Sequence, residues 1–201
     1  MKVVEVFASI QGEGKFIGEP TVFVRLAGCN MRCHWCDTKD SWEGGEDSSV
    51  EEVVGKVRSH GLDAVCITGG EPLLQADELL KLVRALKENG RWITLETNGS
   101  IYDVAVFREV DHVACDMKPP SSGEKSDETI LPRLRPCDYV KVVVADEEDL
   151  DYAKGIIEKS PVEVFLQPAD ASKLAWLAGR VLGEKINARV LPQLHKIIGV
   201  K

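Results

Sequence analysis

Short apolar runs rich in β-branched residues alternate with helix-like segments along most of this chain. The runs cover residues 3–10, 22–26, 64–68, 92–96, 112–116, 139–144, 162–167 and 189–191. Most of them are continuously apolar, which is typical of parallel strands that are covered on both faces. The alternation therefore predicts an α/β fold built on a parallel sheet.

Helical patterns lie between several of these runs. Ser49 followed by Glu52 forms a capping-box signature and predicts a helix from residue 49 to about residue 61. Regularly spaced leucines predict a second helix over 76–88, which ends at Asn89 and Gly90. Further helices are expected over residues 149–159, 171–185 and 101–110, and surface loops over 43–49 and 119–127.

The number of strand–helix units and the chain length together limit the architecture. Six βα units follow residue 22, whereas a complete eight-fold βα barrel takes roughly 250 residues and this chain has 201. We therefore expect one domain over residues 1–201, an incomplete (β/α)6 barrel. The run 3–10 precedes the units and is expected to form a hairpin-like extension.

Charge and hydropathy exclude two classes of partner. Lys and Arg number 25 against 33 Asp and Glu, a net charge of −8, whereas a protein that binds the phosphate backbone needs a basic contact face. No window approaches 18 uncharged apolar residues, and the first residues lack the apolar stretch and cleavage site of a signal peptide. We expect no nucleic acid or membrane partner and a cytoplasmic location.

Polar and glycine-rich segments follow the predicted strands at their carboxyl ends. They read GCNMRCHWCDT, TGGEP, ETNG, DMKPP, ADEED and QPAD in chain order. Parallel α/β folds bind ligands at this edge of the sheet, where the loops after the strands converge. The first four segments are therefore candidates for one binding site.

Three cysteines in the first of these loops carry the most specific signal. Cys29, Cys33 and Cys36 have the spacing C-x3-C-x2-C, and thiolates suit zinc or iron–sulfur clusters. A structural zinc site needs four ligands, and His34 is poorly placed beside Cys33. Three thiolates suit a [4Fe–4S] cubane with one iron left open. Cys66 and Cys115 lie in strand-like runs and are expected to be core thiols.

This spacing, with an aromatic residue before the last cysteine, resembles that of the radical S-adenosylmethionine (SAM) superfamily. The resemblance implies that the amino and carboxylate groups of SAM chelate the fourth iron, and that one electron cleaves the sulfonium to a 5′-deoxyadenosyl radical. The segment Thr68-Gly-Gly-Glu-Pro72 resembles the superfamily's glycine-rich stretch. Its glycines would allow close approach of a ligand, and Glu71 would accept from the ammonium group of SAM.

Residues 9–28 make the resemblance more specific. Gln11 and Glu13 could bond the amide and amine edge of a heterocycle. Arg25 is costly to bury without an anion, so it could bind a substrate carboxylate or pair with a structural carboxylate of the protein. With SIQGEG, FVRLAGCNMRCHWCDT, TGGEP, ETNG and LPQLHK, the chain resembles the family of 7-carboxy-7-deazaguanine synthases nearly end to end. That family implies conversion of 6-carboxy-5,6,7,8-tetrahydropterin with loss of ammonia, a step toward queuosine. The resemblance also implies that the adenosyl radical abstracts the hydrogen at C6 of the pterin and that the hydrogen is later returned.

The family's functional residues carry over by position as implications of the resemblance. Those for the substrate are Ile10, Gln11, Gly12, Arg25, Thr68 and His195, with Glu13 and Arg25 as the catalytic pair. Those for SAM are Trp35, Cys36, Asp37, Gly70, Glu71, Asn98, Asp116, Met117, Lys118 and Gln167. The resemblance also implies Mg²⁺ held by Thr38, a one-electron donor such as flavodoxin, and a homodimer.

Two other readings of the sequence stay open at this stage. An activase that makes a glycyl radical on a partner protein would share the cysteine loop and a chain of this length. A non-catalytic module could use the cysteines for zinc or a structural cluster. Turnover on the carboxypterin without a partner protein discriminates against the first. A cluster whose signal changes on addition of SAM discriminates against the second.

Overall fold

A single nine-stranded sheet organises the computed structural model, which describes residues 1–200. The strand order is β3-β1-β2-β4-β5-β6-β7-β8-β9, and neighbours from β2 to β9 are parallel. The strands are β1 (Lys2–Ile10), β2 (Pro20–Leu26), β3 (Glu46–Asp47), β4 (Ala64–Gly69), β5 (Trp92–Thr97), β6 (His112–Met117), β7 (Tyr139–Val144), β8 (Val164–Pro168) and β9 (Arg189–Val190). The predicted α/β fold is confirmed, and its incomplete barrel opens between β3 and β9.

The first strand forms the predicted extension. β1 pairs antiparallel with β2, with Phe7 opposite Phe23 and Ile10 opposite Pro20. The short β3 pairs with the other edge of β1, Lys2 lying opposite Asp47. The extension was predicted from the sequence, whereas β3 was expected to be loop, because two residues give no strand periodicity.

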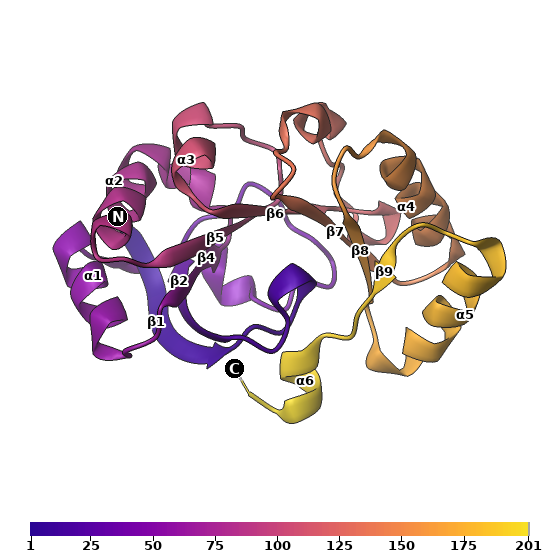
Figure 1. Ribbon diagram of the computed structural model, residues 1–201, viewed down its shortest axis with the longest axis horizontal. Helices are drawn as coiled ribbons and strands as arrows, with labels where there is room; N and C mark the ends of the chain where they lie inside the picture. The colour runs from indigo at the N-terminus through magenta and orange to yellow at the C-terminus, as the bar shows by residue number, and fades with distance from the viewer. Residues whose placement is uncertain (201) are drawn as a thin grey trace.

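The helices α1 to α5 cover the convex side of the sheet, and α6 lies on the opposite side near the carboxyl terminus (Figure 1). They are α1 (Val50–Ser59), α2 (Ala76–Glu88), α3 (Val104–Glu109), α4 (Glu147–Lys159), α5 (Leu174–Glu184) and α6 (Leu194–Ile198). The capping box of Ser49 and Glu52 is present at the start of α1. The predicted bounds of α2 match the structure.

The structure corrects other helix bounds. α4 begins two residues earlier than predicted, because Asp146 rather than Asp149 caps it. The helix predicted over 171–185 is a 3-10 turn, η6 (Ala171–Lys173), followed by α5. Two short 3-10 helices, η4 (Pro120–Ser122) and η5 (Glu128–Arg133), lie between β6 and β7, the first within the segment 119–127 that was predicted as a surface loop. The helix α6 was not predicted, since five residues do not show a full apolar period.

The two faces of the barrel strands have different chemistry. Successive side chains on a strand point to opposite faces. Outward residues such as Val65, Leu95 and Val142 are fully buried in the main core, which includes the apolar side chains of the helices. The inward face carries Glu96 and Lys141, which line a cavity. The sequence pattern of the strands therefore positions both the core and the site.

Aromatic side chains close the other end of the barrel. Phe16 lies edge-on to Trp92 at 4.4 Å and to Tyr139 at 6.1 Å between ring centroids, and Tyr139 contacts Phe165 at 5.3 Å. Trp92 and Tyr139 are the first residues of β5 and β7, so this packing fills the amino ends of the strands. The cavity is thereby confined to their carboxyl ends. No helix within residues 1–200 has both the length and the apolar character needed to cross a membrane.

Candidate active site

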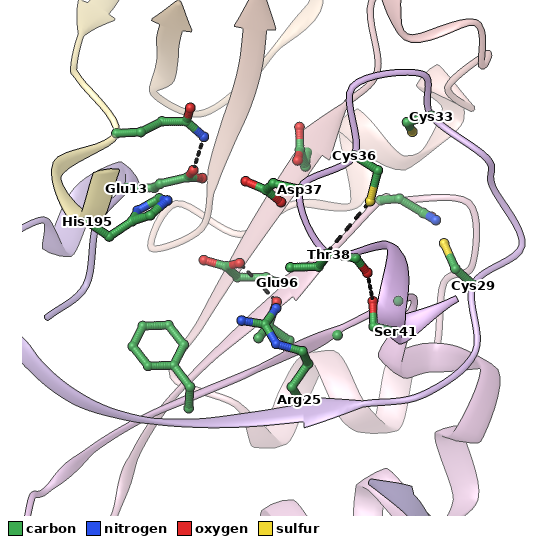
Figure 2. Close-up of a pocket in the computed structure, with 18 of the residues that line it drawn as sticks. Glu13, Arg25, Cys29, Cys33, Cys36, Asp37, Thr38, Ser41, Glu96 and His195 are labelled. Carbon is green, nitrogen blue, oxygen red and sulfur yellow. Dashed lines mark hydrogen bonds between the residues drawn. The ribbon is translucent and has the colours of Figure 1, made fainter. Parts of the chain in front are cut away.

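A cavity of about 600 Å³ lies at the carboxyl ends of the parallel strands. Its walls come from the cysteine loop, from the ends of the strands, and from the C-terminal segment. Figure 2 shows the three cysteines at one end, Glu13 and His195 at the other, and Arg25 and Glu96 between them. Of the predicted site residues, those that line the cavity are Ile10, Gln11, Gly12, Glu13, Arg25, Cys29, Cys33, Trp35, Cys36, Asp37, Thr38, Thr68, Gly70, Asn98, Asp116, Lys118 and His195.

Three predicted cofactor residues are not among those that line it. Glu71 is completely buried, and its carboxylate accepts from the Thr97 hydroxyl and from the backbone N–H groups of Leu73 and Asn98. Met117 is in the main core, on the outward face of β6. Gln167 is fully buried, and its side-chain amide has no hydrogen-bond partner within residues 1–200.

Glu71 was expected to bind the ammonium group of SAM, and in the structure its carboxylate accepts hydrogen bonds from the protein. Burial raises its pKa, and the hydrogen bonds from the backbone and from Thr97 act in the opposite direction. These bonds cap the 3-10 turn η3 (Pro72–Gln75) and fix the end of β5 beside it. The side chain therefore holds two of the loops around the cavity in place.

The three cysteines surround one end of the cavity with free thiols. Burial raises the pKa of Cys29 and raises that of Cys33 to about 11, so metal binding must displace thiol protons. Three thiolates from one loop suit a cluster in which each thiolate binds a different iron.

Hydrogen bonds hold the cysteine loop to two neighbouring loops. The Asn98 side chain donates to Asn30 at 3.0 Å, and the His34 backbone N–H donates to the Ser122 carbonyl at 2.9 Å. The indole N–H of Trp35 donates to the Ser121 hydroxyl at 3.0 Å. The loop is therefore held in position by protein contacts.

The two glycines of the TGGEP turn allow it to pack against the cysteine loop. A Cβ atom on Gly70 would lie 2.0 Å from the carbonyl oxygen of Gly28, and one on Gly69 would lie 2.1 Å from that of Leu26. Gly69 also has a φ of +143°, which side chains disfavour. Both glycines are thus required because the backbone of the TGGEP turn lies close to the backbone of Leu26 and Gly28. The sequence had suggested only a close approach of a ligand.

Arg25 has a protein carboxylate as partner, which the sequence did not identify. Its Nε atom donates to Glu5 at 2.9 Å, and the two residues lie opposite each other in the β1–β2 pair. The guanidinium also lies 5.6 Å from the centre of the Phe7 ring. Burial of Arg25 therefore does not by itself require a substrate anion. Figure 2 shows its guanidinium directed into the cavity.

A charged network that sequence reasoning missed lies beyond Arg25. The ammonium of Lys141 is 2.7 Å from Glu13 Oε2 and 3.6 Å from Glu96 Oε1. Thr68 donates to Glu96 at 3.1 Å. Burial alone would raise the pKa of Glu13, but the charge of Lys141 and hydrogen bonds from Lys141 and Gln193 hold it at about 2. A lysine within the apolar run YVKVVV is the one sequence signal that marks this position.

The C-terminal segment closes the same end of the cavity. The backbone N–H of Leu194 donates to the Gly12 carbonyl at 2.9 Å, and the His195 ring occupies the space that a side chain at position 12 would need. Gln193 donates to Glu13 at 2.7 Å. Residues from the two ends of the chain thus form one wall.

Comparison with known proteins decides the family. Residues 23–142 match the model of the radical SAM superfamily. A 7-carboxy-7-deazaguanine synthase of Methanospirillum hungatei is 43% identical over 202 residues, spanning 100% of this chain and 86% of the relative. That of Thermoplasma acidophilum is 42% identical, over 98% and 97%. The crystal structure of QueE from Escherichia coli has a TM-score of 0.78 at 27% identity, covering 96% of this chain and 94% of that one.

The chain belongs to the 7-carboxy-7-deazaguanine synthase family of radical SAM enzymes. Membership of the superfamily makes a [4Fe–4S] cluster and SAM its cofactors. Neither alternative reading, the glycyl-radical activase or the non-catalytic metal module, is favoured by these relatives.

The cavity wall beside the cysteines combines a charged pair and an aromatic ring. Lys118 donates to Asp116 at 2.7 Å, and its ammonium lies 5.5 Å from the centre of the Trp35 ring. Burial would lower the pKa of Lys118, but the carboxylate of Asp116 raises it above the ordinary value. The second oxygen of Asp116, Oδ1, is buried and has no hydrogen-bond partner within residues 1–200. It is therefore an acceptor available to a ligand.

Proposed function

We propose that the enzyme converts 6-carboxy-5,6,7,8-tetrahydropterin to 7-carboxy-7-deazaguanine with loss of ammonia, in queuosine biosynthesis, and that residues 1–201 form one catalytic domain. The main support is one cavity with three thiols at one end and a network of hydrogen-bonding and charged groups at the other. Two relatives named 7-carboxy-7-deazaguanine synthase, matched over 86% and 97% of their own length, add support.

The cluster would be held by Cys29, Cys33 and Cys36, and together with SAM it supplies a carbon-centred radical. The remaining cofactor contacts are proposed for Trp35, Asp37, Gly70, Asn98, Asp116 and Lys118. The buried Gln167 and Met117 would support this wall from the adjoining strands. The chemistry of the donor set fits, since soft thiolates suit iron–sulfur clusters.

The pterin would occupy the end formed by Gln11, Glu13 and Arg25. A guanidinium that projects into the cavity can pair with the substrate carboxylate. Glu13, ionised because its pKa is about 2, accepts hydrogen bonds from N–H groups of the ring. Glu13 and Arg25 would thereby orient C6 toward the cofactor. The remaining substrate contacts are proposed for Ile10, Gly12, Thr68 and His195.

A magnesium ion is proposed beside Thr38. The Thr38 hydroxyl lines the cavity together with the carboxylates of Asp37 and Asp40, and Mg²⁺ prefers oxygen ligands and often has few from protein. Thr38→Ala is expected to change the dependence of turnover on Mg²⁺ while the cluster content stays the same. An unchanged metal response would remove Thr38 from the site.

The remaining proposals concern partners and location. The family resemblance supports a homodimer and a one-electron donor such as flavodoxin, which light scattering and reduction assays can test. Cytoplasmic location is supported by the six free cysteines, which are typical of a reducing compartment.

The test is ammonia release by the anaerobically reconstituted enzyme with reductant, SAM, Mg²⁺ and the carboxypterin, without any partner protein. We expect release in proportion to pterin consumed. Alanine at position 29, 33 or 36 should abolish cluster assembly and release, whereas Cys137→Ala, which changes a thiol outside the cavity lining, should retain both. Release that persists without the cluster, or a wild-type enzyme that leaves the pterin intact, would contradict the proposal.

A further inference from the structure

Lys141 is a buried cation within the cavity whose role neither the sequence motifs nor the relatives assign. Its side chain is only 3% exposed, and it projects from the middle of β7. Burying an ammonium in a protein is costly unless carboxylates and hydrogen bonds compensate for the lost water. The compensation here comes from Glu13 at 2.7 Å and Glu96 at 3.6 Å.

The arrangement joins five parts of the chain, namely the segment after β1, the strands β4, β5 and β7, and the C-terminal segment. Glu13 precedes the 3-10 turn after β1 and also accepts from Gln193 of the C-terminal segment. Glu96 lies in β5 and also accepts from Thr68 of β4. Lys141 therefore lies at the centre of a network that includes several of the residues proposed to hold the pterin.

The charges around Lys141 do not balance. Two carboxylates share one ammonium, and Glu96 forms no second ion pair within residues 1–200. The titratable groups that face Lys141 from the elements packed against it are Glu13, Glu96, Asp116, Lys118, Tyr139 and Cys66. Asp116 has its own partner in Lys118. Without Lys141, the half-buried carboxylates of Glu13 and Glu96 would therefore lose the ammonium that they share.

We propose that Lys141 is the positioning residue of the pterin end, holding the side chains of Glu13 and Glu96 in place as oriented hydrogen-bond acceptors. This inference rests on the proposed function. Lys141 acts on the substrate through the two carboxylates. Its charge lowers the pKa of Glu13, the direction that a bound ammonium imposes on a carboxylate. When the charge is removed, burial is left to raise the pKa of Glu13, which then takes up a proton more readily.

The experiment compares Lys141→Met, Lys141→Arg and the control Lys154→Met, a lysine that pairs with Asp151 and Glu184 away from the cavity. Each variant is loaded with the cluster, and its fold is checked by circular dichroism. The probes are SAM and 6-carboxypterin, an oxidised pterin with the same ring system and carboxylate but no hydrogen at C6. Anaerobic calorimetry in two buffers of different ionisation enthalpy gives both the Kd and the protons exchanged on binding.

We expect Lys141→Met to raise the Kd for 6-carboxypterin by at least about tenfold, because it removes charge-assisted hydrogen bonds. The Kd for SAM should change by less than about twofold. The variant should release about one proton more than the wild type on binding, because an acceptor must be ionised again. Lys141→Arg should keep the wild-type proton count and most of the affinity, and the control should match the wild type. Unchanged pterin affinity in a folded Lys141→Met, or equal losses for both ligands with no extra proton, would overturn the inference.

A second variant covers the case in which Lys141→Met fails to fold. Lys141→Met with Glu96→Gln removes one charge of each sign and so restores the original net charge. It is expected to fold and still bind 6-carboxypterin at least about tenfold more weakly than the wild type, with SAM unaffected; wild-type affinity would overturn the inference. Failure of the wild type itself to bind 6-carboxypterin would contradict the proposed function instead.

Discussion

The Ser121 hydroxyl donates to the buried carboxylate of Asp149 at 2.6 Å, and the backbone N–H of Ser121 donates to the other carboxylate oxygen at 2.9 Å. Asp149 belongs to α4, and Ser121 belongs to η4, after β6. The same hydroxyl accepts from the Trp35 indole. A carboxylate on a helix outside the barrel thus fixes, through one serine, the residue next to a proposed cluster ligand.

Removal of the Ser121 hydroxyl should loosen the cysteine loop. Ser121→Ala leaves the Trp35 indole without its acceptor. The Kd for SAM should therefore rise by about threefold to tenfold, and the tryptophan emission should change. Calorimetry and fluorescence check this on the cluster-loaded protein. Ser59→Ala, which removes an exposed hydroxyl at the end of α1, is the control. Unchanged SAM affinity and emission would show that the Ser121 bond does not position the loop.

Gly70 should not tolerate even a methyl group. Gly70→Ala places a Cβ atom against the Gly28 carbonyl, so we expect a loss of at least about 2 kcal/mol in the free energy of unfolding, together with poor cluster assembly. Gly55→Ala is the matched control, because Gly55 lies inside α1 with no atom within 4 Å of a new Cβ. It should stabilise the protein by up to about 1 kcal/mol. Chemical denaturation that gives the same sign for both variants would refute the packing argument.

Arg25 should matter more for the pterin than for SAM. Arg25→Ala removes the guanidinium proposed to bind the substrate carboxylate, and we expect at least about a tenfold rise in the Kd for 6-carboxypterin with little change for SAM. Glu5→Gln keeps the guanidinium and tests whether the loss comes only from breaking the ion pair between Arg25 and Glu5. If Glu5→Gln raises the Kd for 6-carboxypterin as much as Arg25→Ala does, the effect of Arg25 comes from its structural ion pair with Glu5 and not from contact with the substrate.

The ion pair of Glu13 should make stability depend on pH in a defined range. Its pKa is about 2 in the folded chain against an ordinary 4.5. The unfolded state therefore binds more protons below about pH 4.5. The stabilisation, on the order of 2 to 3 kcal/mol, is fully present above pH 4.5 and is lost as the pH falls toward 2. Denaturation of the cluster-free chain from pH 6 to pH 2.5 should show a shallower loss for Glu13→Gln. If the wild type and Glu13→Gln lose stability with the same dependence on pH, the pKa of Glu13 is not lowered in the folded chain.

The sequence predicted most of the architecture because its signals are local and strong. The continuous apolar runs and the capping box of Ser49 each identify an element without knowledge of the rest. The cysteine spacing likewise predicted one end of the site. Elements too short for a period, such as β3 and α6, gave no signal.

The residues that sequence reasoning missed depend on strand register. Lys141 and Glu96 are adjacent in space only because β5, β6 and β7 pair in a particular register. Glu5 faces Arg25 across an antiparallel pair for the same reason. Glu71 was placed at the cavity because its motif is, but its own carboxylate turns toward Asn98 instead. A motif indicates where a segment lies, and the direction of each side chain follows from the packing around it.

The mass of the product tests the central claim most directly. After anaerobic incubation of the cluster-loaded enzyme with SAM, reductant, Mg²⁺ and 6-carboxy-5,6,7,8-tetrahydropterin, mass spectrometry should find 7-carboxy-7-deazaguanine. No such product should form with the Cys33→Ala variant. Unchanged pterin beside cleaved SAM, from an enzyme with a full complement of cluster, would contradict the account.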